Sequence, residues 1–524
     1  MNYLNTDAQY YLFNETLNSK IYVDKSMLID KISWQIRTNA KYICITRPRR
    51  FGKTINANML GAYYTKGLES RKLFDRLKVA QTKNYMKHMN SHNVIYIDFS
   101  RTPDICTKYS DYIFSIYNNL RQDLKEAYPV LKEKEYDSVS QMLRDTRDSF
   151  IFILDEWDSI FYRKFMTQDD KNAYLSFLKG LLKDQPYVEL AYMTGVLPIA
   201  KYSSGSELNM FDEYNFMNDN EYDEYFGFNE DEVKILCEQN TAVSYEEMKS
   251  WYDGYYMSDG RSLFNPRSVS KALQRGVCLN YWTETGPMNE IADCIEHNVD
   301  EVREDIVKLV AGIPVEVDLQ GYSASELQLD TRDEILSAMV VYGFLSYHDG
   351  YLKIPNHELM EKYRSVLARE SMGEVKEIVD RSKEMLLATL EGDEAKVAEI
   401  LEYVHDKEIP FLKYNDENAL SCVITLCYLY ARRDYVMERE AKSGKGYCDY
   451  IFLPRKSGKP AIILELKVNA SCDEAIAQIK EKKYLQKVKD YKAVACREAV
   501  SAGINYDKEK KHTCRIERVS IHAD

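Results

Sequence analysis

Four runs of apolar, β-prone residues recur in the first two hundred positions of the chain. The runs are Tyr42–Ile45, Asn93–Asp98, Phe150–Leu154 and Val188–Thr194. Continuous apolar runs of this length are typical of strands that are buried on both faces, as in a parallel sheet. With a helix after the first run, the order predicts an α/β fold with a doubly wound sheet.

The middle of the chain changes to helical patterns with short strands. Residues 230–300 favour helices, interrupted by the turn-forming clusters Trp251–Tyr255 and Phe264–Pro266. An amphipathic helix from Asp333 is followed by two short strands around an Asp349-Gly350 turn. This order predicts a winged-helix module. Because its hairpin carries little Lys or Arg, the module favours an interaction role over direct DNA binding.

The segment after the first predicted strand carries the residues that a nucleotide phosphate requires. It runs Thr46-Arg-Pro-Arg-Arg-Phe-Gly52-Lys53-Thr54. Backbone N–H groups of the loop, including Arg50 and Gly52, would cradle the phosphates. Lys53 would reach the β/γ oxygens, and the Thr54 hydroxyl would ligate Mg²⁺. The usual pattern has Gly where this chain has Arg47, so the assignment depends on a partner motif downstream.

That partner motif follows the third predicted strand. Asp155 and Glu156 end the strand where the crevice of an open α/β sheet lies. Asp155 would hold Mg²⁺ through water, and Glu156 would polarise the attacking water. In P-loop ATPases with an added strand between the two motifs, a polar residue at its end senses the γ-phosphate. Thr194 is in that position, and the alternative is that it only caps the next turn.

The bulk composition narrows the class of protein. The 524 residues suffice for two to four domains, with the 45% hydrophobic and 29% charged content of a globular chain. No signal peptide is evident, and no apolar stretch approaches the roughly 18 residues that span a bilayer. The 11 cysteines form no C-x-x-C pair, which argues against a zinc site and a disulfide framework. We therefore expect a cytoplasmic protein without a membrane partner.

The net charge of −13 argues against a surface broadly adapted to nucleic acid. It leaves room for a local basic groove. In the last fifty residues, positive charges outnumber negative ones, which would suit a surface that follows a nucleic-acid backbone.

A second set of chemical residues lies near the C-terminus. Tyr447–Leu453 and Ala461–Val468 predict a hairpin, with Asp449 on its first strand and Glu465 and Lys467 on its second. Residues two apart in a strand point to the same face, so Glu465 and Lys467 lie together. Asp449 and Glu465 can then share Mg²⁺ or Mn²⁺, while Lys467 orients a water or stabilises the pentavalent phosphate.

Flanking residues extend this set, and a simpler alternative stands beside it. Glu417 and Glu440 offer further carboxylates, and the helix after the hairpin carries Gln478, Lys482 and Lys483. The polar and basic face of that helix suits contact with a nucleic-acid backbone. The alternative is that the hairpin carries only a cross-strand salt-bridge pattern on a solvated face.

Together these motifs give the chain its resemblance to a known group. It resembles a prokaryotic family that couples an AAA-ATPase-like domain to a C-terminal PD-(D/E)XK nuclease-like domain, over nearly its whole length. The resemblance is carried by Tyr22–Lys25, Arg47–Thr54, Leu154–Asp158, Thr194–Lys201, Tyr225–Phe228, Trp251–Tyr255, Asn265-Pro266, Tyr281-Trp282, Asp449, Glu465–Lys467 and Gln478–Tyr484. This combination is far more specific than any single motif.

The resemblance implies roles for individual residues. Nucleotide and Mg²⁺ binding falls to Lys53 and Thr54, hydrolysis to Asp155 and Glu156, and the nuclease triad to Asp449, Glu465 and Lys467. Arg47 matches the family, so that departure belongs to the group.

Two positions depart from the family pattern. A Gly-Arg often precedes the nuclease Asp, whereas this chain has Gly446-Tyr447-Cys448. Phosphate contact there is therefore in doubt, though metal binding is not. Pro198 stands where many relatives carry Arg, which leaves a sensor arginine to Lys201 or the 47–50 loop.

The expected domain plan has five parts. They are an AAA-ATPase-like P-loop core (1–225), a helical lid region (226–300), a winged-helix-like module (301–365), a helical linker (366–410) and a PD-(D/E)XK nuclease-like α/β domain (411–524).

The expected function is an ATP-binding and ATP-hydrolysing protein that regulates a Mg²⁺-dependent DNA nuclease, in defence or mobile-element biology by analogy. The alternative is an ATP-gated interaction switch whose inactive nuclease-like domain binds nucleic acid or protein. A constitutive ATPase motor is a third hypothesis. ATP and DNA are the expected partners, and a homo-oligomer is left open.

Overall fold

The structure is a computed structural model that describes residues 2–103, 106–199, 208–216, 219, 221–257, 259–282, 300–317, 319, 331–369, 372–406, 417–443, 446–491, 494, 496–506 and 511–521. The chain forms two compact units. The first comprises Met1–His297 and Glu316–Glu358, and the second comprises Asn298–Val315 and Leu359–Asp524. Among the described residues, no helix has the length and apolar content needed to cross a membrane. The expected five-part domain plan stays a prediction.

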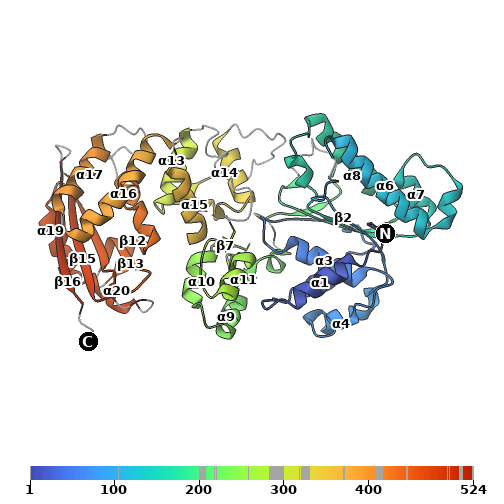
Figure 1. The fold of residues 1–524 in the computed structure, drawn as a ribbon, viewed down its shortest axis with the longest axis horizontal. Coiled ribbons are helices and arrows are strands. Elements are labelled where there is room, and N and C mark those ends of the chain that lie inside the picture. Colours follow the sequence, from blue (N-terminus) through green and yellow to red (C-terminus); the bar gives the residue numbers. More distant parts are fainter. Residues whose placement is uncertain are drawn as a thin grey trace. The chain divides into compact units, whose positions relative to one another are not determined.

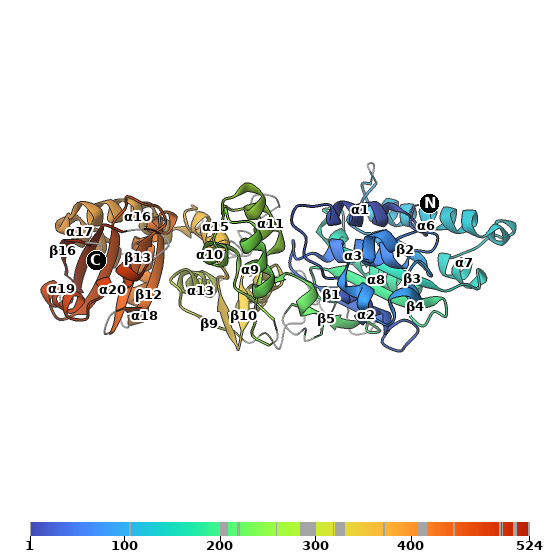
Figure 2. The same cartoon turned by 90° about the horizontal axis from the view of Figure 1, so that it is seen from below.

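A five-stranded parallel sheet forms the centre of the first unit. Its strands are β1 (Tyr42–Thr46), β2 (Asn93–Asp98), β3 (Phe150–Asp155), β4 (Val188–Gly195) and β5 (Asp212–Tyr214). They lie in the order β2-β3-β4-β1-β5 with every pairing parallel (Figure 2). The four predicted strands are confirmed. β4 is the added strand between the phosphate loop and the Asp-Glu strand, because it pairs with both β1 and β3.

Helices cover both faces of this sheet, as predicted for a doubly wound fold. α1 (Ala8–Leu17) and α3 (Lys53–Tyr64) lie on one face, and α6 (Tyr109–Ala127) and α8 (Gln168–Leu182) lie on the other (Figure 1). Shorter helices are α2 (Met27–Ser33), α4 (Arg71–Phe74), α5 (Tyr85–His88) and α7 (Val139–Asp145). A capping box starts α8, where the Thr167 and Asp170 side chains each accept a hydrogen bond from the other's backbone N–H.

The next part of the first unit combines helices with a small antiparallel sheet. The elements are β6 (Phe228–Asn229), α9 (Glu230–Gln239), α10 (Tyr245–Tyr252), β7 (Tyr255–Tyr256), β8 (Ser262–Phe264) and α11 (Pro266–Arg275), with strand order β6-β8-β7. The predicted turn clusters fall at the end of α10 and between β8 and α11. Pro266 is the first residue of α11, where its fixed φ suits a helix start, and Asn265 caps the helix by accepting from Ser268 N.

The predicted helix and hairpin of the winged-helix module are present. α14 (Arg332–Val341) precedes β10 (Ser346–His348) and β11 (Tyr351–Lys353), which pair antiparallel. The two turn residues, Asp349 and Gly350, have φ of +49° and +87°. This left-handed pair is the backbone that a tight two-residue hairpin turn needs. The flanking β9 spans Val315–Glu316.

The second unit contains a mixed five-stranded sheet and its helices. The strands are β12 (Tyr435–Ser443), β13 (Gly446–Pro454), β14 (Ala461–Val468), β15 (Glu498–Tyr506) and β16 (His512–Ser520), in chain order. The helices are α13 (Asp300–Val310), α15 (His357–Leu367), α16 (Glu374–Glu391), α17 (Glu394–Asp406), α18 (Glu417–Cys427), α19 (Cys472–Glu481) and α20 (Leu485–Asp490). The predicted β13–β14 hairpin is confirmed. β14 and β15 pair in parallel, because the crossover through α19 and α20 returns the chain in the same direction.

Gly195, the last residue of β4, lies where a side chain has no room. A Cβ there would approach the Trp157 ring to 2.5 Å and Asp158 Oδ1 to 2.7 Å. We expect Gly195→Ala to lower the free energy of unfolding by about 1–3 kcal/mol, the usual cost of overpacking. The measurement is the midpoint of urea unfolding. Gly180→Ala in α8 is the matched control, because beyond the local backbone of its own helix no atom lies within 4 Å of its Cβ position. That control should be neutral or stabilising, and equal midpoints for the two variants would contradict the prediction.

Candidate nucleotide and phosphodiester sites

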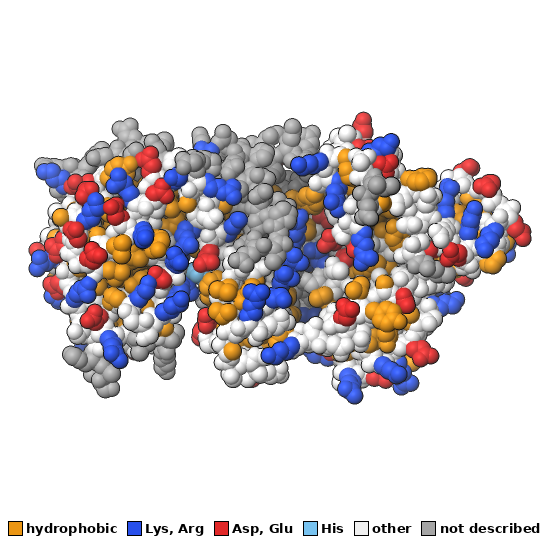
Figure 3. Space-filling view, viewed as in Figure 1, with side chains coloured by type: hydrophobic (Ala, Val, Ile, Leu, Met, Phe, Trp, Pro, Cys, Tyr) orange, Lys and Arg blue, Asp and Glu red, His pale blue; other side chains and the backbone are white. Residues whose placement is uncertain are grey.

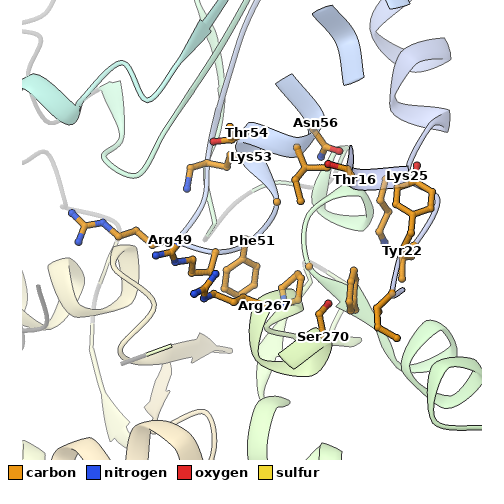
Figure 4. Close-up of a pocket in the computed structure, with 18 of the residues that line it drawn as sticks. Thr16, Tyr22, Lys25, Arg49, Phe51, Lys53, Thr54, Asn56, Arg267 and Ser270 are labelled. Carbon is orange, nitrogen blue, oxygen red and sulfur yellow. The ribbon is translucent and has the colours of Figure 1, made fainter. Parts of the chain in front are cut away.

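A cavity of about 590 Å³ lies in the first unit, where β1 and β3 end. Its lining comes from the loop before α3, from residues 13–25, from α11, and from Tyr342 and Phe344. Figure 4 shows Arg49, Phe51, Lys53, Thr54 and Arg267 around it. On the face drawn in Figure 3, Lys and Arg side chains gather in the hollow between α11 and α3. A concave site of this size at a helix N-terminus suits a phosphorylated ligand.

The loop between β1 and α3 contains two residues with left-handed backbone, on either side of Phe51. Gly52, the N-cap of α3, has φ +92°, and the space where its Cβ would lie is open. Arg50 has φ +75°. The first N–H groups of any α-helix lack partners within the helix. Here they begin beside the cavity, so the loop has the geometry to cradle phosphate oxygens.

Lys53 is a nearly buried cation at the start of α3. Its side-chain ammonium donates to the backbone carbonyls of Arg47 at 2.9 Å and Pro48 at 3.0 Å. Burial lowers the pKa of Lys53, and the carboxylate of Glu156 is the largest opposing influence. Phosphate binding would exchange these two carbonyl partners for phosphate oxygens.

Asp155 and Thr194 are brought together by the pairing of β3 with β4. The Thr194 hydroxyl donates to Asp155 Oδ1 at 2.5 Å, and both side chains are buried. Burial raises the pKa of Asp155 to about 6, while the hydroxyls of Thr194 and Thr54 act in the opposite direction. Among the described residues, no group bonds Asp155 Oδ2. Glu156 follows with φ +52° and lines the cavity.

Arg47 explains why this loop lacks its usual glycine. Its buried guanidinium forms an ion pair with Asp219 and donates to the Tyr214 carbonyl at 2.9 Å. It also lies over the Phe226 ring, 5.1 Å from the centroid. The Arg47 side chain therefore links the phosphate loop to the end of β5 and to the segment that follows it.

The hairpin of the second unit brings the predicted triad together. Asp449 Oδ2 accepts the backbone N–H of Leu466 at 2.7 Å, and Lys467 Nζ donates to Glu465 Oε1 at 3.2 Å. Glu465 is 2% exposed. Burial first, and then the negative charge of Asp449, raise the pKa of Glu465 to about 7. Because Glu465 is buried, the pair is not the solvated salt-bridge pattern that was the alternative.

Helix α19 adds a polar residue to this cluster. Gln478 Oε1 accepts from Lys467 Nζ at 2.6 Å, and the Gln478 amide also bonds Glu465. Lys482 and Lys483 lie at the end of α19, beyond these contacts. Glu440, a second predicted carboxylate, is 63% exposed and lies 3.2 Å from Arg439. The side chain of Glu417, like Lys201, lies outside the described residues.

Comparisons with known proteins match both parts of the chain. Residues 13–204 match the family model of a predicted AAA-ATPase, and residues 415–516 match that of the PD-(D/E)XK nuclease superfamily. The chain joins an AAA-ATPase-like domain to a PD-(D/E)XK nuclease-superfamily domain. No curated protein matches it.

Solved structures similar to this chain are ATPases and origin-recognition proteins. The Walker-type ATPase of Pyrococcus abyssi is 11% identical with a TM-score of 0.36, and the match covers 66% of this chain and 97% of that one. The Aeropyrum pernix ORC2 protein is 12% identical with a TM-score of 0.31, covering 65% and 91%. Drosophila ORC bound to DNA is 11% identical with a TM-score of 0.23, covering 69% and 92%. All three scores are below 0.5, so the two family models and the sheet order carry the assignment.

Both domains contain donors that fit a divalent cation. Asp155 Oδ2 in the AAA-ATPase-like domain and Glu465 Oε2 in the nuclease domain are buried, with no hydrogen-bond partner in the described part of the chain. Within that part, no set of three or more His, Cys, Asp and Glu side chains forms a metal cluster. Mg²⁺ is commonly held by one or two carboxylates with water and phosphate oxygens. The donor sets therefore fit Mg²⁺ or Mn²⁺ that completes its shell from substrate.

Arg267 is a cavity residue that the sequence motifs did not single out. It is the second residue of α11, and its Nε is buried without a partner among the described residues. Burial lowers the pKa of the neighbouring Arg50, and the charge of Arg267 lowers it further. Pro198 does not line the cavity. The sequence feature that could have pointed to Arg267 is its position directly after Asn265-Pro266, where a helix start brings a cation to the helix N-terminus.

The raised pKa of Glu465 predicts that metal binding depends on pH. A carboxyl with a pKa of about 7 is mostly ionised at pH 8 and mostly neutral at pH 6. A divalent ion requires the ionised form, so its affinity should fall about tenfold from pH 8 to pH 6. Calorimetric titration with Mn²⁺ at pH 6 and pH 8 measures this change in affinity. The titration uses the Asp155→Asn variant, so that the carboxylate of the first unit does not contribute to binding. Adding Glu465→Gln should make Mn²⁺ binding weak at both pH values. If the protein with Glu465 intact binds Mn²⁺ equally well at pH 6 and pH 8, the account is contradicted.

Proposed function

We propose that this chain binds and hydrolyses ATP in its AAA-ATPase-like domain and, under that control, cleaves DNA phosphodiester bonds in its nuclease domain. The observation that carries the proposal is the Asp449–Glu465–Lys467 cluster, in which the buried Glu465 keeps one carboxylate oxygen unpaired beside Lys467. A salt bridge formed only for stability does not need such an oxygen, because an unpaired buried acceptor lowers the free energy of unfolding by about 1–3 kcal/mol.

In the AAA-ATPase-like domain, the loop from Arg50 to Gly52 and the first turn of α3 bind the phosphates. Lys53 neutralises the β- and γ-oxygens, and Thr54 and Asp155 hold Mg²⁺. Glu156 orients the attacking water. Thr194 positions Asp155 through its hydrogen bond, and Arg267 adds positive charge from α11. Mg²⁺ held by Thr54 and Asp155 would supply charge neutralisation at the phosphates.

In the nuclease domain, Asp449 and Glu465 would hold Mg²⁺ or Mn²⁺, which would supply Lewis-acid activation of a phosphate and a water. Lys467 stabilises the charge on the phosphate in the transition state. Its ammonium is fixed by Glu465 and Gln478, so little reorganisation is needed. Lys482 and Lys483 contact the DNA backbone beside the cleaved bond.

Packing around the phosphate loop supports control by nucleotide. The Phe51 ring contacts the Tyr255 ring with centroids 5.0 Å apart, and the Tyr255 hydroxyl donates to the Gly343 carbonyl at 2.9 Å. A Cβ on Gly343 would lie 2.7 Å from Pro48. A movement of the loop on ATP binding would therefore displace the residues after α14, which pack against it.

The second candidate is an ATP-gated switch whose nuclease domain binds nucleic acid or protein without cleaving it. The observation that favours it is Tyr447, which replaces the arginine that often precedes the nuclease Asp. Under either function DNA is a proposed partner. Self-association and a cytoplasmic location are further proposals.

Cleavage of plasmid and single-stranded DNA with Mg²⁺ or Mn²⁺ tests the proposal. We expect Asp449→Ala and Lys467→Ala to lower the cleavage rate by about 100-fold or more, because each removes a group that acts on the phosphate. Asp473→Ala on α19 is the matched control, since that carboxylate is 80% exposed, and it should cleave as the wild type does. Absence of cleavage by the wild type, with intact ATP binding, would favour the switch.

A further inference from the structure

The turn that ends α19 fixes the position of Tyr484. Lys483, two residues beyond the helix, has φ +55°. Its N–H donates to the Lys480 carbonyl and the N–H of Tyr484 donates to the Ile479 carbonyl, each at 3.2 Å. A left-handed residue with these two bonds is a Schellman motif, in which the next residue packs on the last helical turn. Tyr484 does so, because its side chain is 1% exposed and shares an apolar cluster with Ile479.

From this turn, a row of hydrogen bonds connects Tyr484 to the candidate nuclease site. Lys467 Nζ donates to Gln478 Oε1 at 2.6 Å, and Gln478 Nε2 donates to the Tyr484 hydroxyl oxygen at 3.2 Å. The Tyr484 hydroxyl donates in turn to the Tyr447 backbone carbonyl at 2.5 Å. The Gln478 amide nitrogen also bonds Glu465. The row therefore runs from the backbone of β13 to the Lys467 ammonium.

The two ends of the row determine the direction of every bond in it. The Tyr447 carbonyl can only accept, so the Tyr484 hydroxyl must donate its one hydrogen there. The hydroxyl oxygen then faces Gln478 as an acceptor, which requires the NH₂ end of the amide on that side. The Lys467 ammonium can only donate, which requires the carbonyl end of the amide on the other side. A reversed Gln478 amide would also place its oxygen against the Glu465 carboxylate, so one orientation alone satisfies the row.

The Lys467 ammonium gains a fixed position from this row. A lysine carries its charge on a flexible four-carbon stem. Lys467 lies one residue before the end of β14, its side chain is 24% exposed, and its bond to Glu465 is 3.2 Å long. Gln478 adds a shorter bond from a different element, α19. A cation that is held in place before the reaction needs less reorganisation when charge develops on a phosphate.

We infer that Tyr484 is a positioning residue of the nuclease site, which holds the Lys467 ammonium in place through Gln478. This inference rests on the proposed nuclease function and adds to it a residue that touches neither the phosphate nor the metal. The simpler alternative is that the Tyr484 hydroxyl only satisfies the Tyr447 carbonyl. The two differ in whether Gln478 and Lys467 respond when that hydroxyl is lost.

Steady-state cleavage of plasmid and single-stranded DNA with Mg²⁺ tests the inference on Tyr484→Phe, which removes only the hydroxyl. We expect kcat to fall roughly 3- to 30-fold, the effect of losing one buried hydrogen bond. KM should change little, because Tyr484 does not contact DNA. Tyr428→Phe is the matched control, since the Tyr428 hydroxyl is also buried in the second unit and bonds Thr389 Oγ1 at 2.7 Å. It should cleave as the wild type does. A wild-type kcat for Tyr484→Phe, or an equal loss in both variants, would overturn the inference.

A double-mutant cycle shows whether Tyr484 acts through Gln478. Gln478→Ala should itself lower kcat, and adding Tyr484→Phe to it should lower kcat no further, because the row is already broken. A tyrosine needed only for packing of the core would lower kcat by the same factor in both backgrounds. Equal factors would therefore overturn the inference, and circular dichroism checks the fold of each variant.

An NMR measurement without DNA separates this inference from the nuclease proposal. In protein labelled with ¹⁵N glutamine, the side-chain amide of Gln478 is the signal that is absent from Gln478→Ala. The signal should move in Tyr484→Phe and in Lys467→Ala, since each removes a partner, and stay in place in Tyr428→Phe. That result supports the positioning of Lys467 even if the wild type cleaves no DNA and the nuclease proposal fails. A Gln478 signal that Tyr484→Phe leaves unchanged overturns the inference, and cleavage by the wild type would then leave the nuclease proposal standing.

Discussion

A buried carboxylate oxygen without a protein partner is the constraint on which both candidate sites depend. Asp155 in the first unit and Glu465 in the second each keep one such oxygen among the described residues. Burial raises the pKa of these groups to about 6 and about 7. An unpaired buried oxygen is costly, so each site has a built-in affinity for a cation that can bond it.

The two units build this constraint from different sheets. In the first, parallel pairing of β3 with β4 sets Thr194 against Asp155 at the edge where the phosphate loop also ends. In the second, an antiparallel hairpin sets Asp449 on β13 beside Glu465 on β14. In the first, Thr194 of the neighbouring strand bonds one Asp155 oxygen, and in the second, Lys467 and Gln478 bond one Glu465 oxygen, so each carboxylate keeps a second oxygen for a ligand. The remaining residues then supply positive charge.

Much of this architecture could be predicted from local pattern. Strands β1 to β4 are long apolar runs, and the Asp349-Gly350 turn is fixed by its own chemistry. Glu465 and Lys467 could be paired because a strand alternates with period two. β5 escaped prediction because Asp212–Tyr214 is a short polar strand, whose position is set by pairing with β1 and not by its own sequence.

Other features depend on residues that are distant in the chain. The partner of Arg47 is Asp219, and the partner of Thr194 is Asp155. Neither contact can be predicted from the spacing of residues in the sequence, because the partners are far apart along the chain. Arg267 reaches the cavity only because α11 folds against the phosphate loop. The sequence shows Tyr447 where the family pattern often has arginine. Its exposure and the hydrogen bond from Tyr484 to its carbonyl depend on the folded domain.

The central claim is that nucleotide bound at Lys53 controls cleavage at Asp449. The most direct measurement compares DNA cleavage with and without ATP for the wild type and for Lys53→Ala, with ATP binding followed in parallel. Lys134→Ala, a surface lysine, is the control. The account predicts that ATP changes the wild-type cleavage rate, and that Lys53→Ala loses both ATP binding and that response. A cleavage rate that ATP alters equally in Lys53→Ala would contradict it.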